Sequence, residues 1–209
     1  MQTTRGLLRT VTIATVLTAG SVAHGALTPT ETVQGTVGML MDILNDPVLQ
    51  QSGMVEDRRA AIEKVLRSAV NYQDMARRTL GVTWILLSES EREHFSNLFV
   101  QVLRDAVASR MNEYSKTQIL YLSEQREGNF AEVRTLFRRD KDDTAINVRL
   151  VNQSGQWLMH DAVIDGVRLV DNYRAQFGHV MKEVAYIGLL GRLEAMTLVP
   201  KAFERTITR

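Results

Sequence analysis

The stretch WLMHDAVIDGVRLVDNYRAQF, residues 157–177, decides the fold of this chain. Its first half is an apolar, strand-like run that ends at Ile164, and a tight turn follows at Asp165-Gly166. From Leu169 onward, apolar residues recur three or four positions apart, and this spacing continues to Val184. The stretch therefore predicts a strand that turns directly into an amphipathic helix.

Four strand-like runs fill the second half of the chain, and short turns separate them. Such short connections predict an antiparallel meander in chain order. Within the strands, one apolar row is expected to contain Val133, Thr135 and Phe137, and another Trp157, Met159, Asp161 and Val163. The four runs are Thr117–Glu124, Phe130–Arg138, Thr144–Val151 and Gln156–Ile164.

The first half of the chain predicts helices. Thr28-Pro29 is a helix start, and Asn45-Asp46-Pro47 is the matching end. A second helix is expected from about Glu56, and a short third one contains Tyr72, Met75, Ala76 and Leu80, with Gly81 as its stop. Ser88 and Glu91 have capping-box spacing before a long helix, whereas the tail from Met196 predicts no definite element.

Helices followed by antiparallel strands and a last helix predict an α+β fold. We expect a strongly curved antiparallel sheet of four or more strands, with helices packed around it. The large apolar residues on the sheet are compatible with a solid core and equally with the lining of an enclosed apolar cavity, because methionine adapts to variable apolar shapes.

The N-terminus is typical of a secretory signal. Arg5 and Arg9 precede an apolar run from Val11 to Ala19, which is far shorter than the roughly 20 residues that span a bilayer. Residues 1–25 are therefore predicted to be a cleaved signal peptide, and residues 26–209 a single domain. Without the two arginines the chain has 23 basic and 24 acidic residues, from 25 and 24 in the whole sequence, which argues against a nucleic-acid binder.

The sequence lacks the usual marks of catalytic and metal sites. There is no cysteine, and no nucleophile elbow, phosphate loop or metal-ligand spacing. His160 and Asp161 are adjacent, but successive strand residues point to opposite faces, so we expect them not to face one pocket. The sequence thus predicts no catalytic residue, no metal and no cofactor.

Two segments resemble the MlaC family, also known as toluene-tolerance auxiliary proteins. Residues 72–84, YQDMARRTLGVTW, are similar to the family pattern FDFxxMAxxxLGxxW. Residues 161–177, DAVIDGVRLVDNYRAQF, are similar to DVxIEGVSLVxNYRxQF. Tyr72, Asp165 and Arg168 depart from the pattern, where phenylalanine, glutamate and serine are usual.

The resemblance implies a periplasmic carrier that shuttles phospholipid between the outer and inner membranes and maintains outer-membrane lipid asymmetry. It implies an apolar slot for acyl chains, with the headgroup near solvent. The implied partners are phospholipid as cargo, an inner-membrane ABC transporter with a substrate-binding ring subunit, and an outer-membrane lipoprotein complex. Because the family includes relatives associated with hopanoids, the lipid species stays open.

The candidate lipid-binding residues come from the apolar rows of the strands and from the segments that resemble the family motifs. We expect lipid contact above all for Val167, because the turn places it between the last strand and the last helix. Arg168 and Arg174 are compatible with a phosphate contact and with a solvated helix face. The candidates are Tyr72, Met75, Leu80, Trp84, Phe99, Val102, Tyr121, Val133, Phe137, Val148, Trp157, Met159, Val163, Val167 and Tyr173.

Two other functions compete with the carrier. A periplasmic chaperone or adaptor for hydrophobic polypeptides also needs apolar surface, as an open groove rather than an enclosed slot. A small cavity enzyme needs an acid and a base within one pocket, which the sequence does not supply.

Overall fold

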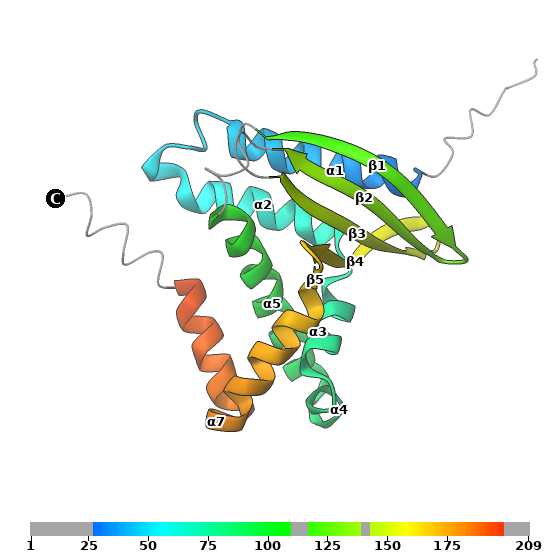
Figure 1. Cartoon of the computed structure of the whole chain (residues 1–209). Coiled ribbons are helices and arrows are strands. Elements are labelled where there is room, and N and C mark those ends of the chain that lie inside the picture. The colour runs from blue at the N-terminus through cyan, green and yellow to red at the C-terminus, as the bar shows by residue number, and fades with distance from the viewer. Residues whose placement is uncertain (1–26, 110–116, 139–142, 199–209) are drawn as a thin grey trace, which may run out of the picture.

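The computed structural model describes residues 27–109, 117–138 and 143–198, so the expected signal peptide lies outside the described residues. Helices fill the first half of the domain, and a sheet and one long helix fill the second (Figure 1). The elements are α1 Pro29–Asn45, η1 Ser52–Met54, α2 Val55–Ala69, α3 Tyr72–Leu80, α4 Thr83–Leu86, α5 Glu89–Ser109, β1 Gln118–Glu127, β2 Phe130–Arg138, β3 Asp143–Gln153, β4 Gln156–Ile164, β5 Val167–Arg168 and α7 Leu169–Leu198.

Three helices, α1, α3 and α5, begin or end at capping residues that the sequence predicts. The Thr28 hydroxyl accepts a hydrogen bond from the Glu31 amide at 3.1 Å, and the Glu31 carboxylate accepts one from the Thr28 amide at 2.8 Å. Glu91 accepts the corresponding bond from the Ser88 amide at 2.7 Å before α5. Gly81 ends α3 with a φ of 56°, a backbone conformation that glycine adopts without strain. The short helix α4 was not expected from the sequence.

The sheet is antiparallel and open, with strands in the order β1-β2-β3-β4-β5. This confirms the predicted α+β class. The short strand β5 follows the two-residue turn Asp165-Gly166, whose φ angles of 47° and 84° are positive, as the tight hairpin turn requires. The Asp165 carboxylate accepts a hydrogen bond from the Ala145 amide at 2.9 Å, which fixes the turn against β3.

A β-bulge in β4 overturns one predicted row of side chains. Met159 pairs with Leu150, whereas Asp161 pairs with the neighbouring Arg149, so His160 is an extra residue. Met159 therefore lies on the face that carries Leu150, and Asp161 and Val163 lie on the opposite face. The prediction that Trp157, Met159, Asp161 and Val163 share one face was wrong, because alternation cannot reveal an inserted residue. The row of Val133, Thr135 and Phe137 on β2 has no such interruption.

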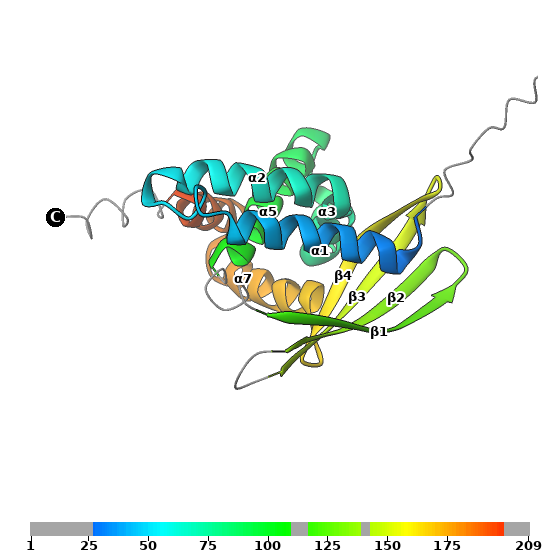
Figure 2. The same ribbon diagram turned by 90° about the horizontal axis from the view of Figure 1, so that it is seen from above.

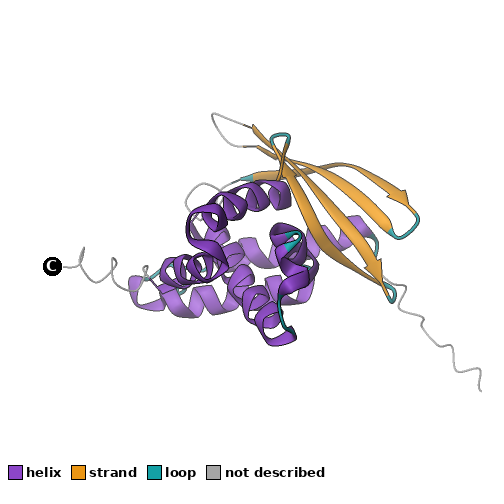
Figure 3. Cartoon of the chain, turned by 90° about the horizontal axis from the view of Figure 1, so that it is seen from below, coloured by secondary structure: helices purple, strands orange, loops and turns teal. Residues whose placement is uncertain are grey.

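The buried side chains form two apolar clusters. The larger one lies among α2, α3, α5 and α7, and the smaller one lies between α1 and the sheet. Figures 2 and 3 show the helices gathered on one side of the twisted sheet, with α1 along it. Met159 packs against both clusters, and its carbonyl accepts a hydrogen bond from the Asn71 amide at 2.7 Å. The helical body and the sheet are thus joined at β4.

The last helix, α7, bends sharply at Ala185, where φ is 56° and ψ is −174°. Beyond the bend the helix returns along α5, and Leu189 and Leu193 enter the larger cluster. The helix covers Met196, at which the sequence predicts no definite element, and extends to Leu198. None of the helices that the structure describes is both long and apolar enough to cross a bilayer.

Candidate functional site

Most of the candidate residues belong to one of the two apolar clusters. Met159 is common to both, and three candidates belong to neither cluster. In the helical cluster lie Tyr72, Met75, Leu80, Trp84, Phe99, Val102 and Tyr173. In the cluster between α1 and the sheet lie Tyr121, Val133, Val148 and Trp157.

The cluster between α1 and the sheet, which we call the α1–sheet layer, combines side chains of the helix with side chains of the strands. Val33 and Val37 of α1 lie over a floor formed by the sheet, and Val33 is fully buried. Tyr121 is at the edge of this floor, and burial raises the pKa of its phenol. The enclosed cavity predicted from the sequence is not confirmed, because side chains of α1 occupy the space against the sheet. The floor consists of Tyr121, Ala131, Val133, Ile146, Val148, Leu150, Trp157 and Met159.

Polar contacts from Thr30 tie the start of α1 to the sheet. The Thr30 amide and hydroxyl donate to one oxygen of Glu124 in β1, at 2.8 and 2.5 Å. Burial raises the pKa of Glu124, but the hydrogen bonds from Thr30 and the ion pair with Arg126 outweigh it and lower the pKa overall. The contact is therefore made to a carboxylate at neutral pH.

Two glycines lie in the part of α1 that covers the sheet, residues 29–38. Gly35 and Gly38 are both exposed, and no atom lies within 4 Å of the position that a Cβ would take on either of them. Close packing therefore does not require glycine at these sites. A glycine inside a helix costs roughly 0.5–1 kcal/mol relative to alanine. The part of α1 that covers the sheet therefore contains two residues of low helix propensity.

Three candidates lie outside both clusters. Phe137 is buried near the end of β2, and Val163 is partly buried on the face of the sheet opposite Met159. Val167 is 57% exposed on β5. The structure therefore does not bring Val167 into an apolar interior, because β5 continues the sheet beyond β4 instead of folding over it.

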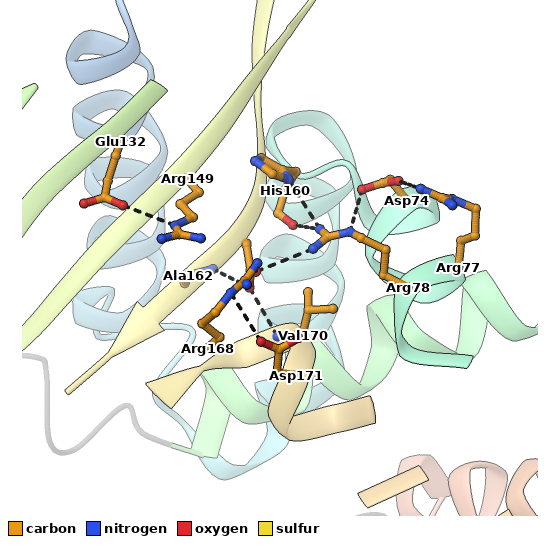
Figure 4. Close-up of polar contacts among 11 residues, drawn as sticks. Asp74, Arg77, Arg78, Glu132, Arg149, His160, Ala162, Arg168, Val170 and Asp171 are labelled. Atoms are coloured by element: carbon orange, nitrogen blue, oxygen red, sulfur yellow. Dashed lines mark hydrogen bonds and ion pairs between the residues drawn. The ribbon is translucent and has the colours of Figure 1, made fainter. Parts of the chain in front are cut away.

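A buried carboxylate, Asp161, joins β4 to the start of α7 (Figure 4). Its Oδ1 accepts hydrogen bonds from the amides of Ala162 and Val170 at 3.0 and 3.2 Å. Its Oδ2 accepts from Arg168 at 3.2 Å and Arg78 at 3.5 Å. Two amides and two arginines thus donate to the carboxylate, and this group of residues is called the Asp161 junction below.

The bulge at His160 brings two adjacent side chains to one arginine. Arg78 contacts the Asp161 carboxylate, the His160 carbonyl and, at 3.4 Å, His160 Nδ1. His160 and Asp161 thus share a contact with one arginine, and the expectation that they do not face one pocket stays a prediction. Burial and the nearby Arg78 lower the pKa of His160 below its usual 6.5, which keeps the ring neutral at pH 7. Because Asp161 is fully engaged by donors, the pair has a structural contact and not the free base that acid–base catalysis needs.

Next to the Asp161 junction lies a pocket of about 450 Å³, bounded by α3, α4 and the start of α7. Four arginines line it, together with Trp84. Arg168 and Arg174 were expected near a phosphate or in solvent, and both line this pocket. Arg77 and Arg78 were not among the residues predicted from the sequence, although two adjacent arginines at the end of a short helix could have indicated a basic site. The four arginines are Arg77, Arg78, Arg168 and Arg174.

No group of three or more histidine, aspartate or glutamate side chains is arranged to hold a metal ion in the part of the chain that the structure describes. The fold and the apolar layer define the class of this protein: an α+β domain in which an open antiparallel sheet and surrounding helices bury an apolar layer between them.

The chain belongs to the MlaC family, whose sequence profile, described as MlaC protein, matches residues 34–195. Among solved structures it is similar to a phospholipid-binding protein from Ralstonia solanacearum, determined in complex with a phospholipid. The TM-score is 0.69 at 17% sequence identity, over 79% of this chain and 94% of the other. None of the curated protein sequences compared with the chain shows significant similarity to it.

Proposed function

We propose that this protein is a periplasmic phospholipid carrier that holds acyl chains in the α1–sheet layer and moves lipid between the outer and inner membranes. The observation that carries the proposal is the apolar floor of the sheet, which the glycine-containing part of α1 covers. Membership of the MlaC family and the likeness to a structure that contains a phospholipid support the same function.

Burial of hydrocarbon supplies enough free energy for such a carrier. Each buried methylene contributes about 0.8 kcal/mol, so a sixteen-carbon chain contributes on the order of 12 kcal/mol relative to water. A ligand held in this way needs no strong headgroup contact, which suits a carrier of lipids with different headgroups. The same free energy makes release into water slow, so delivery requires a docked acceptor and an opening of the protein.

The opening that we propose is a displacement of the first half of α1 from the sheet. This half contributes only Val33 and Val37 to the layer and is tied to β1 through the Glu124 carboxylate. The second half of α1 is anchored differently, because Leu44 is buried in the helical cluster. When the first half moves away, an acyl chain takes its place on the apolar floor.

The partners follow from the proposed transfer. They are an inner-membrane ABC transporter with a substrate-binding ring subunit and an outer-membrane lipoprotein complex. The cargo is a phospholipid, and a hopanoid-type lipid is the variant within the family. Residues 1–25 act as the export signal under this proposal, and no enzymatic step is required of the carrier.

A reversible crosslink tests the proposal directly. The chain has no native cysteine, so Thr30→Cys with Glu124→Cys can be joined by a short reducible thiol crosslinker across the contact that ties α1 to β1. We expect the delipidated, crosslinked protein to take up no fluorescent phospholipid from vesicles and to regain uptake after reduction. The unlinked double variant is the control for the lost hydrogen bonds. Full uptake by the crosslinked protein would contradict the proposed opening.

Native mass spectrometry of the freshly purified protein separates the carrier from its competitors. A lipid-sized added mass, identified after solvent extraction, is the expected result. A lipid-free protein that binds unfolded polypeptides would instead identify a chaperone. Turnover of a small substrate that Asp161→Asn abolishes would identify an enzyme.

A further inference from the structure

The helix α4 presents an apolar surface to solvent. Val82, Ile85 and Leu86 are 77%, 74% and 84% exposed, and their spacing places them on one side of a single helical turn. Figure 1 shows α4 protruding from the end of the molecule farthest from the sheet, the end at which α7 also bends. Near that bend Ile187 is 73% exposed. Scattered exposed apolar residues are common, but such a group on one protruding turn marks a contact surface.

The pocket lined by arginines adjoins this apolar turn, and Val82, Trp84 and Ile85 contribute to its wall. Arg77 pairs with Asp74 at 2.6 Å, and Arg78 pairs with Asp74 and with Asp161. Arg168 pairs with Asp161 and, at 3.4 Å, with Asp171. Burial raises the pKa of Asp74, but its hydrogen bonds and ion pairs with Arg77 and Arg78 lower it overall, so Asp74 carries its charge.

Arg174 is the arginine of this pocket that has no acidic partner among the described residues. Its Nη2 atom lies 3.1 Å from the position that a Cβ on Gly81 would take, so the guanidinium lies against the backbone of the turn before α4. Four guanidinium groups share three carboxylates here, which leaves one positive charge at the pocket. The guanidinium group binds a phosphate through two parallel hydrogen bonds, and it does so without needing a buried site.

We propose that this end of the molecule docks on the surface of an anionic lipid bilayer. Val82, Ile85 and Leu86 enter the interfacial region, and Arg174 binds the phosphate of a membrane lipid. This lipid is distinct from the cargo, because the arginine pocket shares no residue with the α1–sheet layer.

A protruding apolar turn beside a basic pocket fits a bilayer better than a protein groove. An inserted apolar side chain and a neighbouring arginine reach the hydrocarbon boundary and the phosphate level together. Basic side chains adjoin α4 from several elements: four arginines of α3, β5 and α7 line the pocket beside it, and Arg92 of α5 donates to the carbonyls of Trp84 and Ile85 at 3.0 and 3.2 Å. The proposed bilayer contact therefore includes the apolar turn and the arginine pocket beside it.

Vesicle flotation of the mature protein tests the proposal. The vesicles contain either phosphatidylcholine alone or equal parts of phosphatidylcholine and phosphatidylglycerol, each at low and high salt. We expect binding to the anionic vesicles and weakening by salt. Ile85→Ser with Leu86→Ser should weaken binding at least about tenfold. Arg174→Gln should weaken it about fivefold on anionic vesicles and less on neutral vesicles, in which a choline charge balances each phosphate.

Matched controls come from the sheet, at the other end of the molecule. Leu122→Ser removes an exposed apolar side chain from β1, and Arg134→Gln removes an exposed arginine from β2. Both controls should bind vesicles like the wild type. The proposal is overturned if the wild type fails to bind anionic vesicles, or if the controls lose as much binding as the α4 variants.

Cargo content separates this proposal from the proposed function. Native mass spectrometry should find the same lipid in the α4 variants and in the wild type, because these substitutions do not touch the α1–sheet layer. Loss of vesicle binding with retained cargo supports docking through α4. Unaltered vesicle binding by the α4 variants, with loss of binding to a purified protein partner, would overturn bilayer docking while leaving the carrier function intact.

Discussion

Two of the contacts that join the helices of this protein to its sheet have opposite chemistry. The α1–sheet layer is apolar and has few directional contacts, whereas the Asp161 junction is ionic and holds a buried carboxylate with four donors. One apolar group can replace another in an apolar contact with little loss of stability. Removal of one partner from a buried ion pair, in contrast, destabilises the folded protein by several kcal/mol.

The difference indicates which contact opens and which stays closed. Hydrocarbon can replace Val33 and Val37 on the sheet, because an acyl chain supplies the same kind of contact. Nothing in a lipid tail can replace Arg78 or Arg168 at Asp161. We therefore expect the α1–sheet layer to exchange side chains for cargo while the Asp161 junction keeps β4, α3 and α7 together.

Removal of the buried carboxylate should have the largest effect. Asp161→Ala removes the acceptor of the Val170 amide and one of the two carboxylates that pair with Arg78, and we expect it to lower the free energy of unfolding by about 3–5 kcal/mol. Urea denaturation measures the change. Asp171→Ala is the control, because the exposed Asp171 makes only a surface ion pair with Arg168, worth about 0–1 kcal/mol. Equal losses in the two variants would remove the contrast between the buried and exposed carboxylates.

Local sequence signals predicted most of the fold. The caps at Thr28 and Ser88, the glycine stop at Gly81 and the strand β2 all lie where the sequence places them. These features depend on neighbours within a few residues, and their physical causes are therefore visible in the sequence. The α+β class follows from the order of such elements.

The features that were missed depend on contacts between distant residues. The bulge at His160 arises from pairing with β3, and it moves Asp161 to the face opposite Met159. The exposure of Val167 results from the pairing of β5 with β4. The arginine pocket likewise joins α3 to α7, which are far apart in the sequence. Alternation and spacing do not contain this information.

A smaller loss of stability is expected from a substitution in the α1–sheet layer. Val33→Ala removes two methyl groups from a fully buried site, which should lower the free energy of unfolding by about 2 kcal/mol. It should also speed phospholipid transfer between vesicles, because α1 then covers the sheet less firmly. Val48→Ala, on an exposed residue after α1, is the control and should change neither quantity. Slower transfer by Val33→Ala would contradict the role of α1 as a cover.

Strengthening α1 should have the opposite effect on transfer. Gly35→Ala and Gly38→Ala place a methyl group in open space, and each should stabilise the protein by roughly 0.5–1 kcal/mol. We expect lipid uptake, followed by fluorescence, to slow in both variants. Gly53→Ala in η1 also has open space but lies outside α1, so it should leave uptake unchanged. Equal slowing by Gly53→Ala would show that overall stability, and not α1, controls uptake.

The smallest expected effect is a pH dependence at the Asp161 junction. Burial and Arg78 lower the pKa of His160 below 6.5, so the unfolded chain binds a proton there at a pH where the folded protein does not. Stability that is present above the unfolded pKa is then lost as the pH falls through about 6.5. His160→Gln should reduce the loss of unfolding free energy between about pH 7 and about pH 5.5, measured by urea denaturation at each pH. His179→Gln, which changes an exposed histidine on α7, is the matched control. If His160→Gln lost as much unfolding free energy on acidification as the wild type, the acid sensitivity would have to come from carboxylates such as Glu124. The lowered pKa of Glu124 places its contribution to stability at lower pH.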